Sequence, residues 1–298
     1  MQTRRIGDRD VSAIGLGAMP LTMDQRPTEE DAIATVHAAL EAGVTLIDTA
    51  DAYTWAERGP GANEEVVAKA LASYGGSTVD VLVATKGGHT RDGADWGLDG
   101  RPGYLRKACE ASLRRLGVEK IGLYQHHRPD PDVPYEETMG GLKDLYDAGL
   151  VERVGVSNAD PDQIKLAHKV LGDALVSVQN QFSPRYRSSE PEIGVCEELG
   201  LAFLPWSPLG GIAKAKDLGS SYAAFTDIAD ERDVSPQQVC LAWELAISPC
   251  VIPIPGASRP ASIESSAAAV HITLSDEEVA RLSHRHAAAS LAEDHDLH

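Results

Sequence analysis

The sequence predicts an α/β fold, a (β/α)8 barrel preceded by a short β-hairpin. Short apolar segments alternate with helix-like segments along almost the whole chain, and eight strand-and-helix pairs follow one another from Ala13. A length of 298 residues suits such a barrel. A doubly wound open sheet is the alternative, because it shows the same alternation. No change in composition divides the chain, so we expect one domain over residues 1–298.

The first segments predict a hairpin, a strand and a helix. Residues 1–12 are polar, with a Gly7-Asp8 turn typical of a hairpin, and Ala13–Gly17 is the first buried strand. Thr28–Asp31 resembles a capping box at the start of a helix, and Gly43 is a suitable C-cap for the end of that helix.

Further strands and helices then alternate in the same way, and several of the helices are ended by a glycine or opened by a cap. The predicted strands are Val44–Asp48, Val81–Thr85, Ile121–Gln125, Arg153–Val156, Val176–Gln179, Leu201–Pro205 and Cys250–Ile254. The predicted helices are Asn63–Ser73, Pro102 to Gly117, Pro134 to Gly149, Asp162–Leu171, Pro191–Leu199, one opened by Ser235-Pro236, Ala261–Ala269 and one from Asp276. Residues 286–298 are rich in alanine and charge, and we expect a loose tail there.

The composition excludes several classes of function. A net charge of -18 disfavours nucleic acid as a partner, and an anionic cofactor would need a local cation or a helix N-terminus. No apolar run approaches the length of a membrane span, and no apolar run follows the N-terminal charges as in a signal peptide. Widely spaced cysteines favour reduced, buried thiols in a cytoplasmic protein. For the oligomeric state, we favour a monomer. The cysteines are Cys109, Cys196, Cys240 and Cys250.

The common phosphate-loop and metal motifs fail. Two glycine-rich stretches, at residues 15–20 and 59–64, lack the third glycine of a dinucleotide fingerprint, and no triphosphatase loop occurs. His126 and His127 would point to opposite faces of a strand, while His284 and His286 lack a matching carboxylate pattern. We therefore expect no metal site.

Four titratable groups follow successive strand ends and predict an acid–base site: Asp48 and Tyr53, then Lys86, then His127. A phenol with a reference pKa of about 10 is a slow acid at neutral pH unless a neighbouring cation stabilises its anion. Lys86 can supply that charge, and Asp48 can keep a buried Lys86 protonated. The set lacks a strong nucleophile but suits protonation of a carbonyl oxygen. Asp51 is interpreted as a turn residue.

Several short segments occur in a fixed order over most of the chain, from Ile14 to about Ser266. They are Ile47–Tyr53, Ala84–Lys86, Leu123–Asp130, Gly155–Asn158, Trp206–Gly210 and Ile254–Gly256. In this ordered combination the chain resembles the aldo-keto reductase superfamily.

The resemblance implies an NADPH-dependent reductase of aldehydes or ketones, working reversibly on a small-molecule substrate, with Tyr53 as the general acid and Asp48, Lys86 and His127 completing a tetrad. Ser157, Asn158 and Gln179 would bind the nicotinamide amide, and Trp206 would stack on the nicotinamide ring. The pyrophosphate would lie along Ser207, Leu209 and Gly211. The 2′-phosphate of the adenosine would meet Gly256, Ser258 and Arg259. Arg259 favours NADP over NAD.

Three features depart from the family pattern or extend it. Ser265-Ser266 stands where many relatives carry an acidic residue and asparagine near the adenine. Arg128 replaces an aromatic residue and is either a handle for an anionic substrate or a rim charge. The long segment 87–100 is expected to wall the substrate site, with Trp55 and Trp96 as apolar walls or as rim packing. A coenzyme-binding regulatory subunit of the same fold and a non-redox barrel enzyme are the rival functions.

Overall fold

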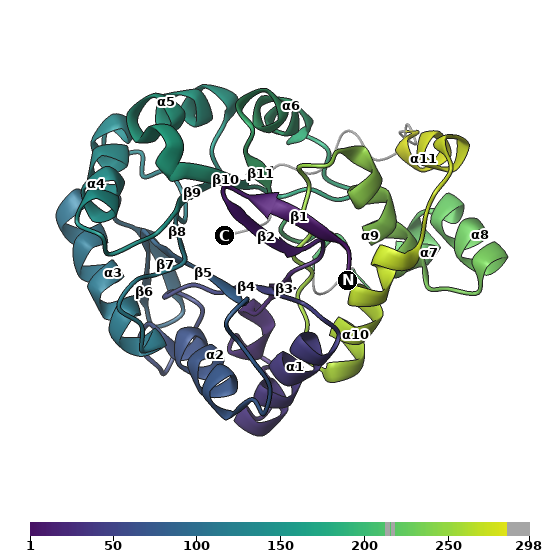
Figure 1. The fold of residues 1–298 in the computed structure, drawn as a ribbon, viewed down its shortest axis with the longest axis horizontal. Helices are drawn as coiled ribbons and strands as arrows, with labels where there is room; N and C mark the ends of the chain where they lie inside the picture. Colours follow the sequence, from purple (N-terminus) through teal and green to yellow (C-terminus); the bar gives the residue numbers. More distant parts are fainter. Residues whose placement is uncertain (212–214, 216–217, 285–298) are drawn as a thin grey trace.

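The computed structural model describes residues 1–211, 215 and 218–284, so the predicted tail at 286–298 lies outside the described residues. Seven parallel strands form one curled sheet in the order β11-β10-β9-β8-β5-β4-β3 (Figure 1). Their bounds are β3 Leu16–Gly17, β4 Leu46–Asp48, β5 Leu82–Gly87, β8 Leu123–His126, β9 Val154–Ser157, β10 Leu175–Gln179 and β11 Ala202–Phe203. The strands follow the chain order around the sheet, as a (β/α)8 barrel requires.

Residues 250–256 are the eighth wall of the barrel. They lie between β11 and β3, where Val251 pairs in parallel with Phe203 and Gly256 pairs in parallel with Gly17. Two prolines interrupt this segment and cannot donate backbone hydrogen bonds, so its pairing is discontinuous and no regular strand forms. The predicted strand at Cys250–Ile254 therefore closes the barrel through isolated bridges. We call the closing segment, residues 250–256, together with its contacts to β11 and β3, the seam.

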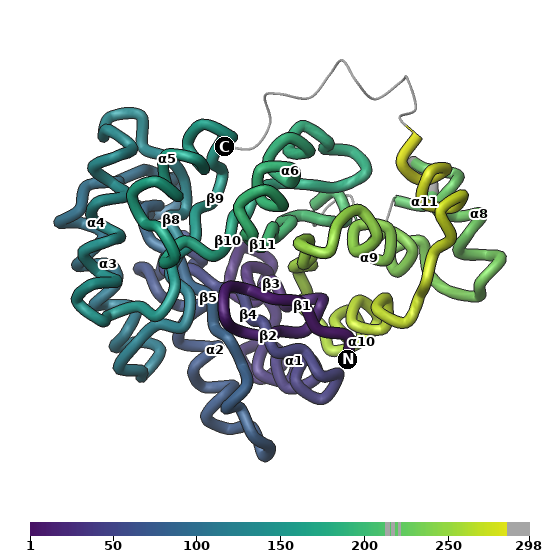
Figure 2. Tube along the Cα trace, turned by 45° about the horizontal axis from the view of Figure 1, so that its top comes forward, coloured from purple at the N-terminus to yellow at the C-terminus, as the bar shows by residue number. Residues whose placement is uncertain are grey.

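Helices surround the strands on the outside (Figures 1 and 2). Their bounds are α1 Glu29–Glu41, α2 Ala62–Ser73, α3 Pro102–Leu116, α4 Tyr135–Asp147, α5 Pro161–Leu171, α6 Glu190–Leu199, α7 Leu218–Ser221, α8 Ala223–Arg232, α9 Pro236–Ile247, α10 Pro260–Ala268 and α11 Asp276–Ser283. Caps explain several of the starts: Thr28 accepts from the backbone N–H of Asp31, and α9 begins with a full capping box between Ser235 and Gln238.

The helices α7 and α8 are not among the elements predicted from the sequence. Both views show them with α11 in a lobe beside α9. Phe225, Ile228 and Ala229 of α8 are buried at helical spacing, and the Phe225 ring lies 5.9 Å from that of Trp243 in α9. This periodic apolar face is the signal that would have located α8.

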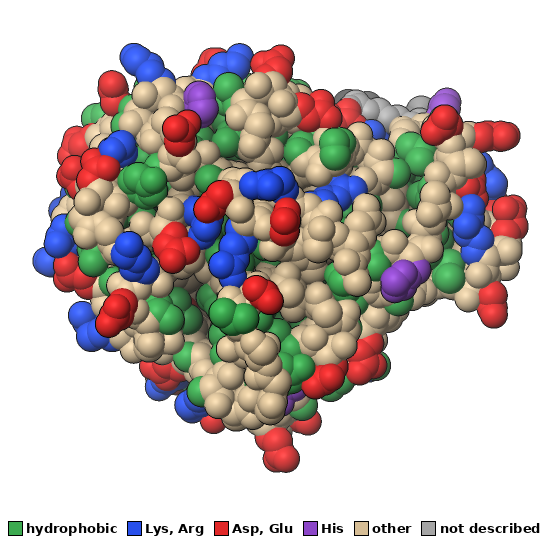
Figure 3. All heavy atoms as spheres, viewed as in Figure 1, with side chains coloured by type: hydrophobic (Ala, Val, Ile, Leu, Met, Phe, Trp, Pro, Cys, Tyr) green, Lys and Arg blue, Asp and Glu red, His purple; other side chains and the backbone are tan. Residues whose placement is uncertain are grey.

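An N-terminal hairpin of β1 Thr3–Ile6 and β2 Arg9–Ser12 is present as predicted, and it covers the amino-terminal end of the barrel. Ile6 and Val11 pack in one apolar cluster with the first residues of several strands, among them Leu46 and Leu82. Gly7 turns above Val176 with a φ of 60°, where an added Cβ would lie 2.6 Å from that side chain. Lys and Arg side chains gather near the centre of this face (Figure 3). The hairpin therefore covers this end of the barrel (Figure 1).

A second hairpin, β6 His89–Asp92 and β7 Asp95–Leu98, fills the segment predicted as a long loop at residues 87–100. Its two-residue turn begins with Gly93, whose φ of 58° favours glycine. This hairpin follows β5 and so rises from the carboxyl-terminal end of the barrel. None of the helices within the described residues is long and apolar enough to cross a membrane.

We expect Gly17→Ala to weaken the seam. A Cβ at Gly17 would lie 2.7 Å from the backbone oxygen of Ile254, so the closing segment would have to move. The expected cost is about 1–3 kcal/mol of unfolding free energy, measured by urea denaturation. Gly59→Ala is the matched control, because no heavy atom lies within 4 Å of its added Cβ. Equal stability of the two variants would contradict this account of the seam.

Candidate active site

The four predicted acid–base residues meet at the carboxyl-terminal end of the barrel. Asp48 ends β4, Lys86 is the fifth residue of β5, and His127 directly follows β8. Tyr53 lies in the segment after β4, and its side chain turns back to the same place. Because parallel strands bring their carboxyl ends to one rim, groups far apart in sequence become neighbours.

Lys86 is the centre of this group. Its ammonium is fully buried and donates three hydrogen bonds: to Asp48 Oδ2 at 2.6 Å, to the Thr49 carbonyl oxygen at 2.9 Å and to the Tyr53 hydroxyl at 3.0 Å. All three donors of the ammonium are therefore used. Burial alone lowers the pKa of Lys86, but the neighbouring Asp48 and Tyr53 outweigh burial and raise the pKa. Lys86 is accordingly charged at neutral pH.

Asp48 is held by two amides as well as by Lys86. Its Oδ1 accepts from Gln125 Nε2 at 3.2 Å and from Gln179 Nε2 at 2.7 Å, and the residue is 3% exposed. These bonds satisfy a carboxylate that water hardly reaches. Gln125 is not among the predicted site residues, although its position at the end of a predicted strand was a usable signal. Gln179, expected at the nicotinamide amide, here donates to Asp48.

Tyr53 is buried and protonated. Burial raises the pKa of its phenol above the ordinary value, and the charge of Lys86 opposes that rise without cancelling it. The hydroxyl thus keeps its proton at neutral pH while standing beside a cation that would stabilise the phenolate. This combination is what a proton donor needs.

His127 is a neutral imidazole. Its ring meets the Tyr53 ring edge-on, with centroids 5.5 Å apart. Burial, with the adjacent His89 and Lys86, holds the pKa of His127 well below its usual value. Its Nδ1 is buried and has no hydrogen-bond partner among the described residues. A neutral ring of this kind can donate one hydrogen bond to a substrate oxygen but carries no charge.

The residues predicted for the nicotinamide form a connected group beside the tetrad. The Ser157 hydroxyl donates to the Gln179 carbonyl oxygen at 2.7 Å, and Asn158 Nδ2 donates to the His127 carbonyl oxygen at 3.0 Å. Trp206 Nε1 donates to Asn158 Oδ1 at 3.2 Å. Asn158 has a φ of 56°, a strained backbone that these bonds hold in place.

The residues predicted for the phosphates lie on the two sides of the seam. Ser207, Leu209 and Gly211 follow β11. Gly256 ends the closing segment, and Ser258 and Arg259 follow it. Arg259 is exposed and is the N-cap of α10, so a guanidinium stands next to a helix N-terminus. Both features attract anions, which fits these residues to a phosphate group.

Asp51 lies in a turn, as the sequence predicted, and its side chain is also buried. It is 3% exposed, its Oδ1 has no partner among the described residues, and burial together with Glu64 raises the pKa of its carboxyl well above the ordinary value. Glu64 accepts from Thr85 Oγ1 at 2.5 Å and from Arg115 Nε at 2.5 Å. A buried acidic network therefore lies directly behind the tetrad, which a single sequence motif could not reveal.

The sequence matches the model of the Aldo/keto reductase family over residues 13–285.

The chain belongs to the aldo/keto reductase family. It is therefore an oxidoreductase that acts on carbonyl or alcohol groups with a nicotinamide cofactor.

Named relatives agree with this family assignment. An uncharacterized oxidoreductase of Schizosaccharomyces pombe is 38% identical, over 94% of this chain and 88% of its own. A probable aldo-keto reductase of Glycine max is 34% identical, over 91% and 84%. Among solved structures, a glycerol dehydrogenase from Gluconobacter oxydans has a TM-score of 0.80 at 28% identity, covering 94% and 93% of the two chains. An aldo/keto reductase from Klebsiella pneumoniae in complex with NADP and acetate has a TM-score of 0.77 at 28% identity, with the same coverage.

Ser265 and Ser266, which stand where many relatives carry an acidic residue and asparagine, lie on a helix of this aldo/keto reductase. Ser265 and Ser266 lie well inside α10 and are half-buried, and the Ser265 carbonyl oxygen accepts from Gln238 Nε2 at 3.1 Å. In residues 1–211, 215 and 218–284, no three His, Cys, Asp or Glu side chains are grouped to hold a metal ion.

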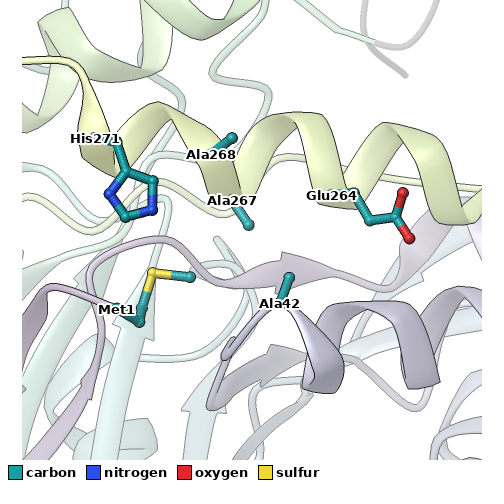
Figure 4. A pocket seen from close by; sticks show the side chains of 6 residues that line it. All are labelled: Met1, Ala42, Glu264, Ala267, Ala268 and His271. Atoms are coloured by element: carbon teal, nitrogen blue, oxygen red, sulfur yellow. The ribbon is translucent and has the colours of Figure 1, made fainter.

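A hollow of about 200 Å³ lies between α1 and α10 and is unrelated to the tetrad (Figure 4). Met1, at the start of the chain, forms one wall, and Glu264 and His271 approach it from α10 and the turn that follows. Met1 directly precedes the β1–β2 hairpin, so this hollow belongs to the amino-terminal end of the barrel. The four predicted acid–base residues lie at the opposite end.

Proposed function

We propose that this chain reduces an aldehyde or ketone to an alcohol with NADPH, reversibly, with Tyr53 as the proton donor. One observation carries the proposal: the Lys86 ammonium, fully buried, bonds both the Tyr53 hydroxyl and the Asp48 carboxylate. A protonated phenol beside a permanent cation is suited to protonate a carbonyl oxygen as charge develops on it.

Each member of the tetrad then has a distinct task. NADPH, when bound, supplies the hydride to the carbonyl carbon. Tyr53 gives its hydroxyl proton to the carbonyl oxygen, and Lys86 stabilises the phenolate that results. Asp48 keeps Lys86 charged, and neutral His127 donates a hydrogen bond that orients the substrate oxygen. In the reverse direction Tyr53 takes the proton back from the alcohol.

The preference for NADP over NAD rests on Arg259. Its exposed guanidinium at the start of α10 is suited to a 2′-phosphate, and the run from Gly256 to Arg259 contains no acidic side chain that would repel it. The Klebsiella relative in complex with NADP supports the same cofactor. The relatives are oxidoreductases by name, which favours an enzyme over a regulatory subunit.

Arg259→Ala is expected to weaken NADPH binding by about 10- to 100-fold, because a hydrogen bond to a charged group is lost, and to leave NADH binding nearly unchanged. Fluorescence titration of each coenzyme measures both constants. Arg114→Ala, which removes an exposed arginine from the last turn of α3, controls for the loss of one positive charge. Equal losses for NADPH and NADH would exclude the 2′-phosphate role.

A substrate panel tests the proposed reaction as a whole. Aldehydes, ketones and sugars are offered with NADPH and its oxidation is followed at 340 nm, and alcohols are offered with NADP⁺ in the reverse direction. We expect turnover of at least one carbonyl class and formation of the matching alcohol. No turnover in either direction with a correctly folded protein would overturn the proposal.

A further inference from the structure

A row of aromatic rings leads from Tyr53 outward to solvent. The His127 ring lies edge-on to Tyr53, His89 lies edge-on to His127 with centroids 4.3 Å apart, and Trp96 lies edge-on to His89 at 5.2 Å. His89 and Trp96 both belong to the β6–β7 hairpin, and Trp96 is 38% exposed. The hairpin therefore forms one wall of the approach to the proposed proton donor.

Two arginines stand along this wall. Arg91 lies on the Trp96 ring, 4.3 Å from its centroid, and one of its nitrogens donates to the Gly93 carbonyl oxygen at 3.1 Å. Arg128 directly follows His127 at the end of β8. After burial, the charges of both arginines help lower the pKa of His89 to about 4. The charges of two arginines from different elements thus act on the same neutral imidazole.

Neither arginine has a carboxylate partner among the described residues, although acidic residues lie nearby in the sequence. Asp130, two positions beyond Arg128, accepts instead from the backbone N–H groups of Gly100 at 2.8 Å and Asp132 at 2.9 Å.

Other acidic groups of this region are also engaged or turned outward. Asp99 forms an ion pair with Arg101, and Asp92 and Asp95 face each other at the exposed tip of the hairpin. Arg91 and Arg128 therefore have no ion-pair partner among the described residues, although carboxylates lie in the same region. Two guanidinium groups without a carboxylate partner favour an anion at this place.

We infer that the substrate is an aldehyde or ketone that also carries an anionic group, such as a carboxylate, which Arg128 and Arg91 bind beside His89 while the carbonyl oxygen meets Tyr53. This inference rests on the proposed function, because it names the class of carbonyl compound that the same site takes. A guanidinium matches a carboxylate with two parallel N–H donors. The neutral His89 and His127 add hydrogen bonds without repelling the cations.

The test compares two aldehydes that differ in one charge, 4-oxobutanoate and its methyl ester, by kcat/KM with NADPH. The wild-type chain is expected to prefer the acid over the ester by about tenfold or more, the lower range for a hydrogen bond to a charged group. Arg128→Gln is expected to reduce this acid-to-ester ratio about tenfold, and Arg128→Lys to retain part of it. Arg91→Gln should reduce the ratio less, because Arg91 is already held on Trp96.

Arg114→Gln, which removes a positive charge from the outer layer, is the control and should leave the ratio unchanged. If the ester is reduced as well as the acid by the wild-type chain, or if Arg128→Gln leaves the ratio where it was, the inference is wrong while the proposed reaction stands. If neither aldehyde nor any other carbonyl compound is reduced, the proposed reaction itself fails.

Discussion

Replacing Tyr53 with Phe is expected to lower kcat for carbonyl reduction on the order of 10²- to 10⁴-fold, the usual contribution of a general acid. The substitution removes one oxygen atom, and with it the proton that the carbonyl oxygen would receive. The Tyr53 ring and its packing on His127 stay, so NADPH affinity should change little. Stopped-flow measurement of single-turnover reduction, together with a coenzyme titration, separates these two effects.

Tyr135→Phe is the matched control for this experiment. The Tyr135 hydroxyl is also buried, but it has no hydrogen-bond partner among the described residues, and its ring lies near His126 on the outer side of β8. This variant should turn over like the wild-type chain. If Tyr53→Phe did the same, another group would have to be the proton donor.

Lys86→Met is expected to have the second large effect, on stability as well as on activity. Asp48 would lose its ion partner while remaining 3% exposed, and an unpaired buried charge costs roughly 3–5 kcal/mol. The bonds from Gln125 and Gln179 would offset part of that cost. Urea denaturation at pH 7 measures the loss, and reduction of the best aldehyde from the panel measures activity.

The double variant Asp48→Asn with Lys86→Met separates the two roles. It contains neither buried charge, so most of the lost unfolding free energy should return, whereas activity should stay low because nothing stabilises the phenolate. Recovery of activity in the double variant would show that the Lys86 charge is not needed. A double variant as unstable as Lys86→Met would show that packing, and not the unpaired carboxylate, sets the stability.

The place of the four acid–base residues could be predicted because Asp48, Lys86 and His127 lie at or next to the carboxyl end of a strand with a clear apolar pattern, and Tyr53 lies in the segment after β4. The strand ends alone place Asp48, Lys86 and His127. A parallel barrel then brings these strand ends together at one rim. Thr28 and Ser235 located helix starts for an equally local reason, since an N-cap is read within four residues.

Other features depend on contacts between distant segments and could not be predicted in this way. The raised pKa of Asp51 depends on burial and on Glu64 of α2, whose partners Thr85 and Arg115 come from β5 and α3. Gln125 reaches Asp48 across the barrel interior. The β6–β7 hairpin is different, because its two-residue turn starting at Gly93 was a local signal that the loop interpretation passed over.

The seam has a consequence for motion and ligand response. The two prolines of the closing segment donate no backbone hydrogen bond, and its pairing depends on bonds such as those from Ile252 to Phe203 and from Gly17 to Pro255. We expect thermal opening of the barrel to begin along this line. The residues proposed to hold the coenzyme phosphates come from the segment after β11 and from the end of the closing segment, and so from both sides of this line. Bound NADPH would then hold the two sides of the seam together. When NADPH is added, amides near Phe203 and Gly17 should exchange with deuterium more slowly, and the melting temperature should rise.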